Sequence, residues 1–138
     1  IAEVSVDRET GEVRLLRVTS THDIGQVLNP IGHQGQINGG VVQAMGHSLM
    51  EEIGVTSTGR VDVANLNDYK MPTMADLPVL TTALVESEDG LGPYRTKGIG
   101  EYSIEALAAA VANAVADASG VRVASLPVTA EKLHTLLS

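Results

Sequence analysis

The chain has 138 residues and a formal net charge of −8 at pH 7, and its apolar side chains are aliphatic, because it contains no Phe, no Trp and only three Tyr. The acidic charge repels a phosphate backbone and the chain lacks aromatic platforms for base stacking, so we expect no nucleic-acid partner. Without Cys, the chain has no disulfide, zinc-thiolate site or iron–sulfur cluster of its own. No apolar run approaches the roughly 20 residues that span a bilayer.

The first elements are predicted to form a hairpin. Residues 1–7 alternate apolar and polar side chains, as a half-buried strand does. Arg8 to Gly11 indicate a tight turn with Gly11 in the left-handed conformation, and residues 12–22 indicate the returning strand. A loop with Asp23, Gly25, Asn29 and Pro30 ends this part of the chain.

A glycine-rich helix is predicted from about Ile31 to Glu52, where apolar residues recur at helical spacing. A glycine inside a helix costs roughly 1 kcal/mol relative to alanine, so a cluster of them indicates that something approaches the backbone closely. Two interpretations stay open for the stretch Gly35 to Gly46: close helix packing, or phosphate contact by free N–H groups at a helix start, which would use Gly35 to Gly40. Gln36 and Gln43 either contact a polar cofactor, since amides both donate and accept, or are surface residues.

The second half mixes element types without a regular βαβ repeat. Residues 53–78 are irregular, and a Gly/Pro-rich loop runs from Asp89 to Gly100. The other expected elements are a strand at 79–86, a helix from Ser103 to Ser119 with Gly120 as C-cap, a short strand at Val121–Ser125, and a last helix with Thr129 as N-cap. The prediction is one α+β domain, 1–138, with a small mixed sheet, a Gly-rich helix, an Ala-rich helix and a short C-terminal helix.

The loop that ends in Lys97-Gly-Ile-Gly-Glu101 is the most informative stretch for chemistry. One interpretation of Glu101 is a helix-start acid, favoured by the helix dipole. The other is a general base on a loop whose glycines, Gly98 and Gly100, let a substrate or cofactor come close. Lys97 is either a cofactor contact or a solvated charge, and Arg95 either binds a substrate carboxylate or is exposed. The four histidines show no metal-ligand spacing, so we expect no metal site built from them.

Several stretches, taken together, resemble the molybdenum-hydroxylase family of xanthine dehydrogenases, aldehyde oxidoreductases and carbon monoxide dehydrogenases. In chain order they are VSVDRETGEVRLLRV, HDIGQVLNP, GQINGGVVQAMGHSLMEE, NDYKMPTMADLP, KGIGE and AAAVANAVADA. One such motif would be weak, but the family's order along nearly the whole chain makes the resemblance specific. Arg95-Thr96 departs from the Gly-Ala that many relatives have before the KGIGE stretch.

The resemblance implies hydroxylation of an aldehyde or N-heterocycle with water as the oxygen source and Glu101 as the catalytic base. It implies a molybdenum-pterin cofactor, with the cytosine dinucleotide form as one alternative. The cofactor contacts implied are Gln36, Gly39, Gly40, Gln43, Lys97 and Gly98, the last two beside the metal centre. FAD and [2Fe-2S] clusters on partner subunits or domains would carry the electrons away.

The family subunit is several times longer than this chain. We therefore expect a C-terminal fragment of a cytoplasmic subunit that is inactive and cofactor-free alone, an expectation with which the missing initiator Met agrees. Its partners would be the N-terminal remainder, the FAD and iron–sulfur subunits and a small-molecule substrate. The alternative function is a non-catalytic binding or assembly module, and a weaker one is a phosphate-binding domain.

Overall fold

The computed structural model describes residues 1–138 and contains a three-stranded sheet in the order β1-β2-β3. β1 is antiparallel to β2, whereas β3 is parallel to β2. The strands are β1 (Ala2–Val6), β2 (Val13–Asp23) and β3 (Val79–Val85), and the α-helices are α1 (Pro30–Leu49), α2 (Leu107–Ser119) and α3 (Ala130–Leu137). The mixed sheet with these three helices confirms the predicted α+β class.

The β1–β2 hairpin forms as the alternating pattern predicts. Gly11 lies in its turn with φ +77°, and a Cβ atom at this position would collide with the backbone oxygen of Ala130. Glycine is therefore required twice, by the left-handed backbone and by the close approach of α3. The turn thus ties the start of the chain to its last helix.

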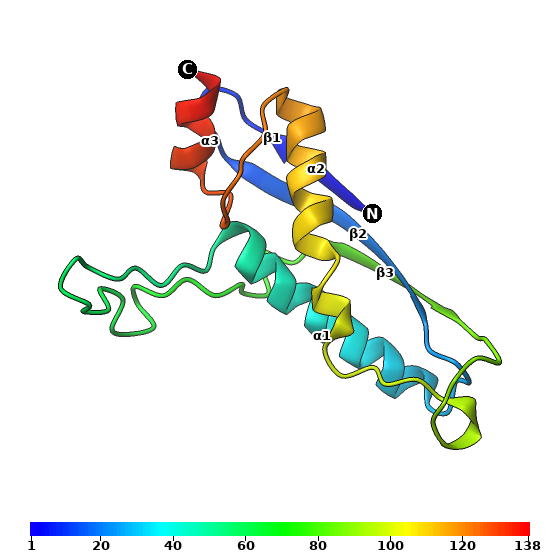
Figure 1. Ribbon diagram of the computed structural model, residues 1–138. Coiled ribbons are helices and arrows are strands. Elements are labelled where there is room, and N and C mark those ends of the chain that lie inside the picture. The colour runs from blue at the N-terminus through cyan, green and yellow to red at the C-terminus, as the bar shows by residue number, and fades with distance from the viewer.

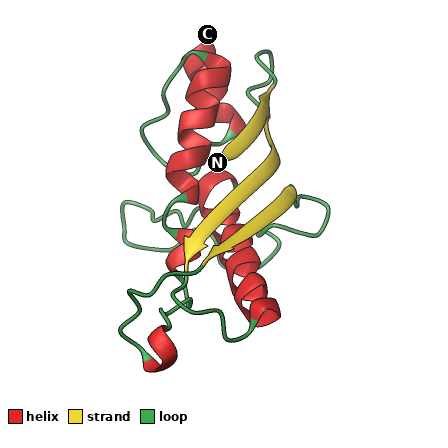
Figure 2. Ribbon diagram, turned by 90° about the vertical axis from the view of Figure 1, so that its right-hand side faces the viewer, coloured by secondary structure: helices red, strands yellow, loops and turns green.

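The helices cover one face of the sheet, as Figure 2 shows. Strand residues alternate between this covered face and an open one, where Val79 and Val85 stay about half exposed. The core lies between the sheet and the helices and draws on every α-helix. Its fully buried members include Val18, Ile37, Val41, Val111, Val115 and Leu133.

Helix α1 begins at Pro30, and the Asn29 side chain caps it by accepting a hydrogen bond from the Gly32 N–H at 2.9 Å. It ends at Leu49, three residues before the predicted Glu52. Because the helix begins at Pro30, Gly35 to Gly40 lie in its interior, where backbone N–H groups bond to the preceding turn. The interpretation of Gly35–Gly40 as a helix start for phosphate is therefore wrong.

Two long segments without regular strands or α-helices project on opposite sides of the molecule (Figure 1). The arm, residues 50–78, joins α1 to β3 and is irregular as predicted. The loop after β3 contains a 3-10 turn, η1 (Pro93–Arg95), and is followed by a second one, η2 (Tyr102–Ile104). Because α2 begins only at Leu107, the predicted helix start at Ser103 is wrong by one turn.

The C-terminal part follows the prediction except at one strand. Gly120 caps α2 in the left-handed conformation, and Thr129 caps α3 by accepting from the Lys132 N–H at 3.3 Å. The predicted strand Val121–Ser125 does not form, although Val121 and Val123 pack on the core. None of the helices combines the length and the hydropathy needed to cross a membrane.

Candidate functional site

The end of β2 carries a carboxylate that joins three segments of the chain. Asp23 Oδ1 accepts hydrogen bonds from the Gly25 N–H at 3.0 Å and from Ser87 Oγ at 2.8 Å. Its Oδ2 lies 2.7 Å from the Lys97 ammonium. The Lys97 hydrogen bond, followed by those from Gly25 and Ser87, lowers the pKa of Asp23 to about 2. Asp23 is therefore ionised at neutral pH and ties the loops after β2 and β3 to the Lys97–Glu101 stretch.

The backbone makes the same connection. The Ile24 carbonyl accepts from the Lys97 N–H at 3.0 Å, and the Arg95 carbonyl accepts from the Gln26 N–H at 3.1 Å. Gly25 lies between these bonds with φ +64°, and a Cβ atom there would collide with the Arg95 oxygen. The glycine of the HDIGQ stretch is thus explained by the close approach of the loop that leads to Glu101.

Lys97 directs its ammonium at Asp23, an arrangement that neither sequence interpretation of Lys97 included. Its side chain stays 32% exposed. Lys97 also lines an open hollow of about 520 Å³, together with Asp89, Leu91, Gly92, Thr96 and Gly98. The ion pair therefore fixes the Lys97 side chain, while part of it and Gly98 stay accessible.

Glu101 is exposed and lies directly before η2. Its carbonyl accepts from the Ile104 N–H at 3.0 Å, but its carboxylate makes no capping hydrogen bond. The element that begins here has only three residues, and α2 starts six positions later at Leu107. Dipole stabilisation of an acid needs aligned peptides in a helix of some length. The geometry therefore gives little support to the helix-start interpretation.

The residues after Glu101 are packed into the fold. The Tyr102 ring stands edge-on to His22 with ring centroids 4.8 Å apart. Burial, and then the charge of Asp23, raises the pKa of Tyr102, and burial lowers the pKa of His22. Ser103 is buried, and its Oγ occupies the place where a Cβ atom of Gly40 would lie. The segment 98–101 is thus attached to the fold at both ends.

The contact of Gly40 with Ser103 brings the two glycine-rich stretches of the sequence together. The close packing predicted for the Gly-rich helix is confirmed at Gly40, which packs against η2. Gly39 lies next to this contact and is exposed. Gln36 and Gln43 are also exposed, and their spacing of seven residues places them on one stripe of α1. The helical members of the sequence-predicted set therefore lie in the middle of α1, where Gly40 contacts η2.

Four glycines of this region have open surroundings. Cβ atoms added at Gly35, Gly39, Gly98 and Gly100 would meet nothing within 4 Å, and none of the four has a positive φ. Neither backbone conformation nor packing inside the chain thus requires glycine there. Open backbone beside the Gln36 and Gln43 amides fits a polar organic group such as a pterin. The chain has no cluster of three His, Asp or Glu side chains able to hold a metal ion.

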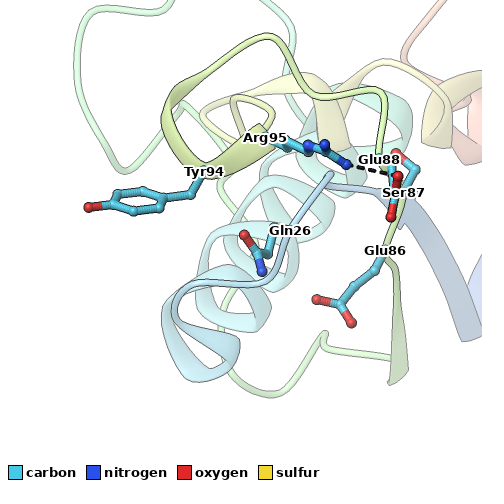
Figure 3. A pocket seen from close by; sticks show the side chains of 6 residues that line it. All are labelled: Gln26, Glu86, Ser87, Glu88, Tyr94 and Arg95. Carbon is cyan, nitrogen blue, oxygen red and sulfur yellow. Dashed lines mark hydrogen bonds and ion pairs between the residues drawn. The ribbon is translucent and has the colours of Figure 1, made fainter.

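A separate hollow of about 440 Å³ lies over the loop after β3 and is lined by Gln26, Glu86, Ser87, Glu88, Tyr94 and Arg95. Figure 3 shows the Arg95 guanidinium turned toward Glu88, with 2.8 Å between Nη1 and Oε2, and the Tyr94 ring pointing away. Any substrate carboxylate would have to compete with Glu88 for Arg95. Tyr94 and Arg95 adopt φ of +56° and +60°, which side chains other than glycine seldom do.

Asp23 and Ser87 are functional candidates that the sequence analysis did not name. The sequence places Asp23 in a loop, and the only signal of a further role is its place in HDIGQVLNP, directly after a predicted strand. Its partners lie 64 and 74 residues farther along the chain, at Ser87 and Lys97. A single sequence carries no pattern that pairs residues at such separations.

Comparison with known proteins identifies the family. The family described as "Molybdopterin cofactor-binding domain" matches residues 1–78. The putative xanthine dehydrogenase molybdenum-binding subunit XdhA of Escherichia coli is 41% identical over 133 residues, which is 96% of this chain and 18% of that protein. The aldehyde oxidoreductase molybdenum-binding subunit PaoC of Escherichia coli is 36% identical over 95% of this chain and 18% of its own length.

Solved structures of related enzymes have the same fold as this chain. Quinoline 2-oxidoreductase from Pseudomonas putida 86 superposes with a TM-score of 0.92 at 33% identity, over 97% of this chain and 17% of that one. Aldehyde oxidoreductase from Desulfovibrio gigas gives 0.89 at 32% identity, over 99% of this chain and 15% of that one.

The chain belongs to the molybdopterin cofactor-binding domain family. More narrowly, it corresponds to a small part of the molybdenum-binding subunit of the xanthine dehydrogenase, aldehyde oxidase and carbon monoxide dehydrogenase group. It spans less than a fifth of the length of these relatives. The matched family region stops before Lys97–Glu101, but the relatives align over almost the whole chain.

Proposed function

We propose that this chain supplies the catalytic-base segment of a molybdenum hydroxylase that oxidises an aldehyde or N-heterocycle with water as the oxygen source. Glu101 is the general base. The observation that carries this proposal is an exposed, uncapped carboxylate on a segment attached to the fold at both ends, beside glycines with open surroundings. A base needs this combination of access and fixed position.

The other proposed roles follow from the surroundings and the exposure of each residue. Gln36 and Gln43 would hydrogen-bond the polar edge of the pterin, and Gly39 and Gly98 would let it approach the backbone. Gly40 and Lys97, whose contacts inside the chain are with Ser103 and Asp23, would hold the surrounding backbone in place. When bound, the molybdenum-pterin group would supply the two-electron redox chemistry.

The complete enzyme is proposed to be cytoplasmic and to combine this part with the rest of its molybdenum subunit. FAD and [2Fe-2S] partners would carry the electrons away, and the pterin would have either the simple or the cytosine dinucleotide form. One relative supports separate subunits, because it is subunit gamma of the 6-hydroxypseudooxynicotine dehydrogenase complex of Paenarthrobacter nicotinovorans.

The test is single-turnover reduction of the complete enzyme by an aldehyde or N-heterocycle, comparing wild type with Glu101→Gln at equal molybdenum content. Gln keeps the shape of the side chain but removes its basicity, so we expect a rate loss of about 10²–10⁴-fold. A matched control is Glu105→Gln, an exposed carboxylate four residues farther on, which should leave the rate unchanged. A loss of about tenfold or less for Glu101→Gln would favour the non-catalytic alternative, a binding or assembly module.

A further inference from the structure

Two neighbouring residues at the end of β2 hold the two ends of the segment that carries Glu101. Asp23 binds the Lys97 ammonium at 2.7 Å, and His22 packs edge-on against Tyr102 with 4.8 Å between the rings. Successive residues of a strand point to opposite faces. The two attachments therefore lie on opposite sides of the strand end, and the segment 98–101 bridges them.

The bridging segment has little rigidity of its own. Gly98 and Gly100 lack side chains, and a Cβ atom added at either position would meet nothing within 4 Å. Glycine has the largest backbone freedom of any residue, so the position of Glu101 depends on the ends of the segment. The Tyr102 end is held by its packing against His22. The Lys97 end is fixed by the Asp23 carboxylate and by two backbone bonds, from the Lys97 N–H to Ile24 and from the Gln26 N–H to Arg95.

Asp23 in turn is held more firmly than a surface carboxylate. It accepts hydrogen bonds from the Gly25 N–H and from Ser87 Oγ, besides its ion pair with Lys97. The orientation of the Asp23 carboxylate is therefore set by the loops after β2 and β3, and not by Lys97 alone. Such a fixed carboxylate can position a lysine, whereas most exposed ion pairs contribute little.

We propose that Asp23 is a positioning residue for Glu101: by holding Lys97 it fixes the Gly98–Gly100 backbone that presents the base. This inference rests on the proposed function, since it needs Glu101 to be the base. It assigns Asp23 no contact with the substrate or the reacting atoms.

The experiment is a double-mutant cycle in the complete enzyme with Asp23→Asn, Glu101→Gln and the combined variant. Asn keeps an oxygen that can accept from Gly25 and Ser87 but removes the charge that holds Lys97. A misplaced reacting group costs about 10–100-fold, so we expect Asp23→Asn to lower the single-turnover rate by that factor at unchanged molybdenum content. In the Glu101→Gln background it should cost no more than about twofold, because the group that it positions is gone. Asp23→Glu should restore part of the rate.

A second readout does not depend on the loaded enzyme. In the molybdenum-free complete subunit, amide hydrogen exchange of the peptide covering 97–103 should be faster in Asp23→Asn than in wild type. The matched control is Glu3→Gln, which removes a carboxylate from another ion pair of the sheet, with Arg17 at 3.6 Å. It should change neither the rate nor the exchange of this peptide.

The outcomes separate the two proposals. An equal loss from Asp23→Asn with and without Glu101, or no loss at all, would overturn the positioning role while Glu101 stays the base. Unchanged exchange of the 97–103 peptide would also overturn it. A small effect of Glu101→Gln by itself would reject the proposed base, and the positioning role with it.

Discussion

At the scale of single residues, Asp23 shows how an exposed carboxylate acquires a structural role. It stays 43% exposed, yet three donors converge on it from the loops after β2 and β3 and from the Lys97–Glu101 stretch. Each donor favours the ionised form, and together they lower its pKa from 3.8 to about 2. The same contacts must then favour the folded chain whenever Asp23 is ionised.

This shift predicts an acid-sensitive contribution to stability. The folded-state pKa is depressed, so the contribution is fully present above about pH 4 and is lost as the pH falls toward about 2. Urea unfolding of the 138-residue chain and of its Asp23→Asn variant should show midpoints that differ most near neutral pH and converge in this acid range. If the two midpoints instead differ by the same amount down to about pH 2, ionised Asp23 does not stabilise the folded chain in this way.

At the scale of elements, α1 has two neighbouring glycines with opposite surroundings. Gly40 is buried under Ser103, whereas Gly39 faces open space. Glycine is unfavourable inside a helix at both positions, so the reason for each glycine must lie in its surroundings. One position serves packing inside the chain, and the other is available to a group from outside it.

Alanine at each position should separate these roles. Gly40→Ala forces Ser103 to move and should lower the free energy of unfolding of the molybdenum-free subunit by about 1–3 kcal/mol. Gly39→Ala should raise it by up to about 1 kcal/mol, because alanine is the better helix former. If the pterin approaches at Gly39, that same variant should lose molybdenum in the complete enzyme. Full molybdenum content in Gly39→Ala would remove Gly39 from the proposed contacts.

At the scale of the whole molecule, the arm presents an unusual amount of apolar surface. Ile53, Leu66 and Met74 are between 63% and 84% exposed. Exposed apolar side chains grouped in one segment usually mark a contact surface. Since the chain spans less than a fifth of its relatives, we expect the remainder of the subunit to cover the arm.

Methionine oxidation tests this expectation. Met74 is 84% and Met71 50% exposed, whereas Met45 is 2% exposed and lies in the core. Peroxide should oxidise Met71 and Met74 quickly in the isolated chain and slowly in the complete subunit, with Met45 protected in both. Met45 also reports whether the isolated chain is folded. Equal oxidation of Met74 in both forms would show that the arm stays uncovered.

Local patterns in the sequence were sufficient for most of the fold. The hairpin turn at Gly11, the cap at Thr129 and the α1 periodicity all depend on neighbouring residues, and the structure confirms them. The strand at Val121–Ser125 was wrong for a physical reason. Alternating apolar residues indicate a half-buried strand. Val121 and Val123 are half-buried against the core as this pattern predicts, but no strand lies beside them to form a ladder.

The candidate site could be predicted only in part. Gly98 and Gly100 indicate a site because loop glycines let a substrate or cofactor come close, and the glycines inside α1 do so because each has a cost that needs a reason. The dependence of Gly98 and Gly100 on Asp23, and the meeting of Gly40 with Ser103, arise from contacts between distant segments. The order of the motifs indicated the family, but only the fold shows which residues hold the Glu101 segment.

The pairing of Asp23 with Lys97 also has a consequence for biosynthesis. The two residues lie 74 positions apart, with β3 between them in the sequence. A ribosome that adds about 5–20 residues per second delivers Lys97 roughly 4–15 s after Asp23. During that interval the Asp23 carboxylate has no lysine partner, although both strands of the hairpin have been synthesised. The support proposed for Glu101 therefore cannot form until Lys97 has been added, well after both strands of the hairpin.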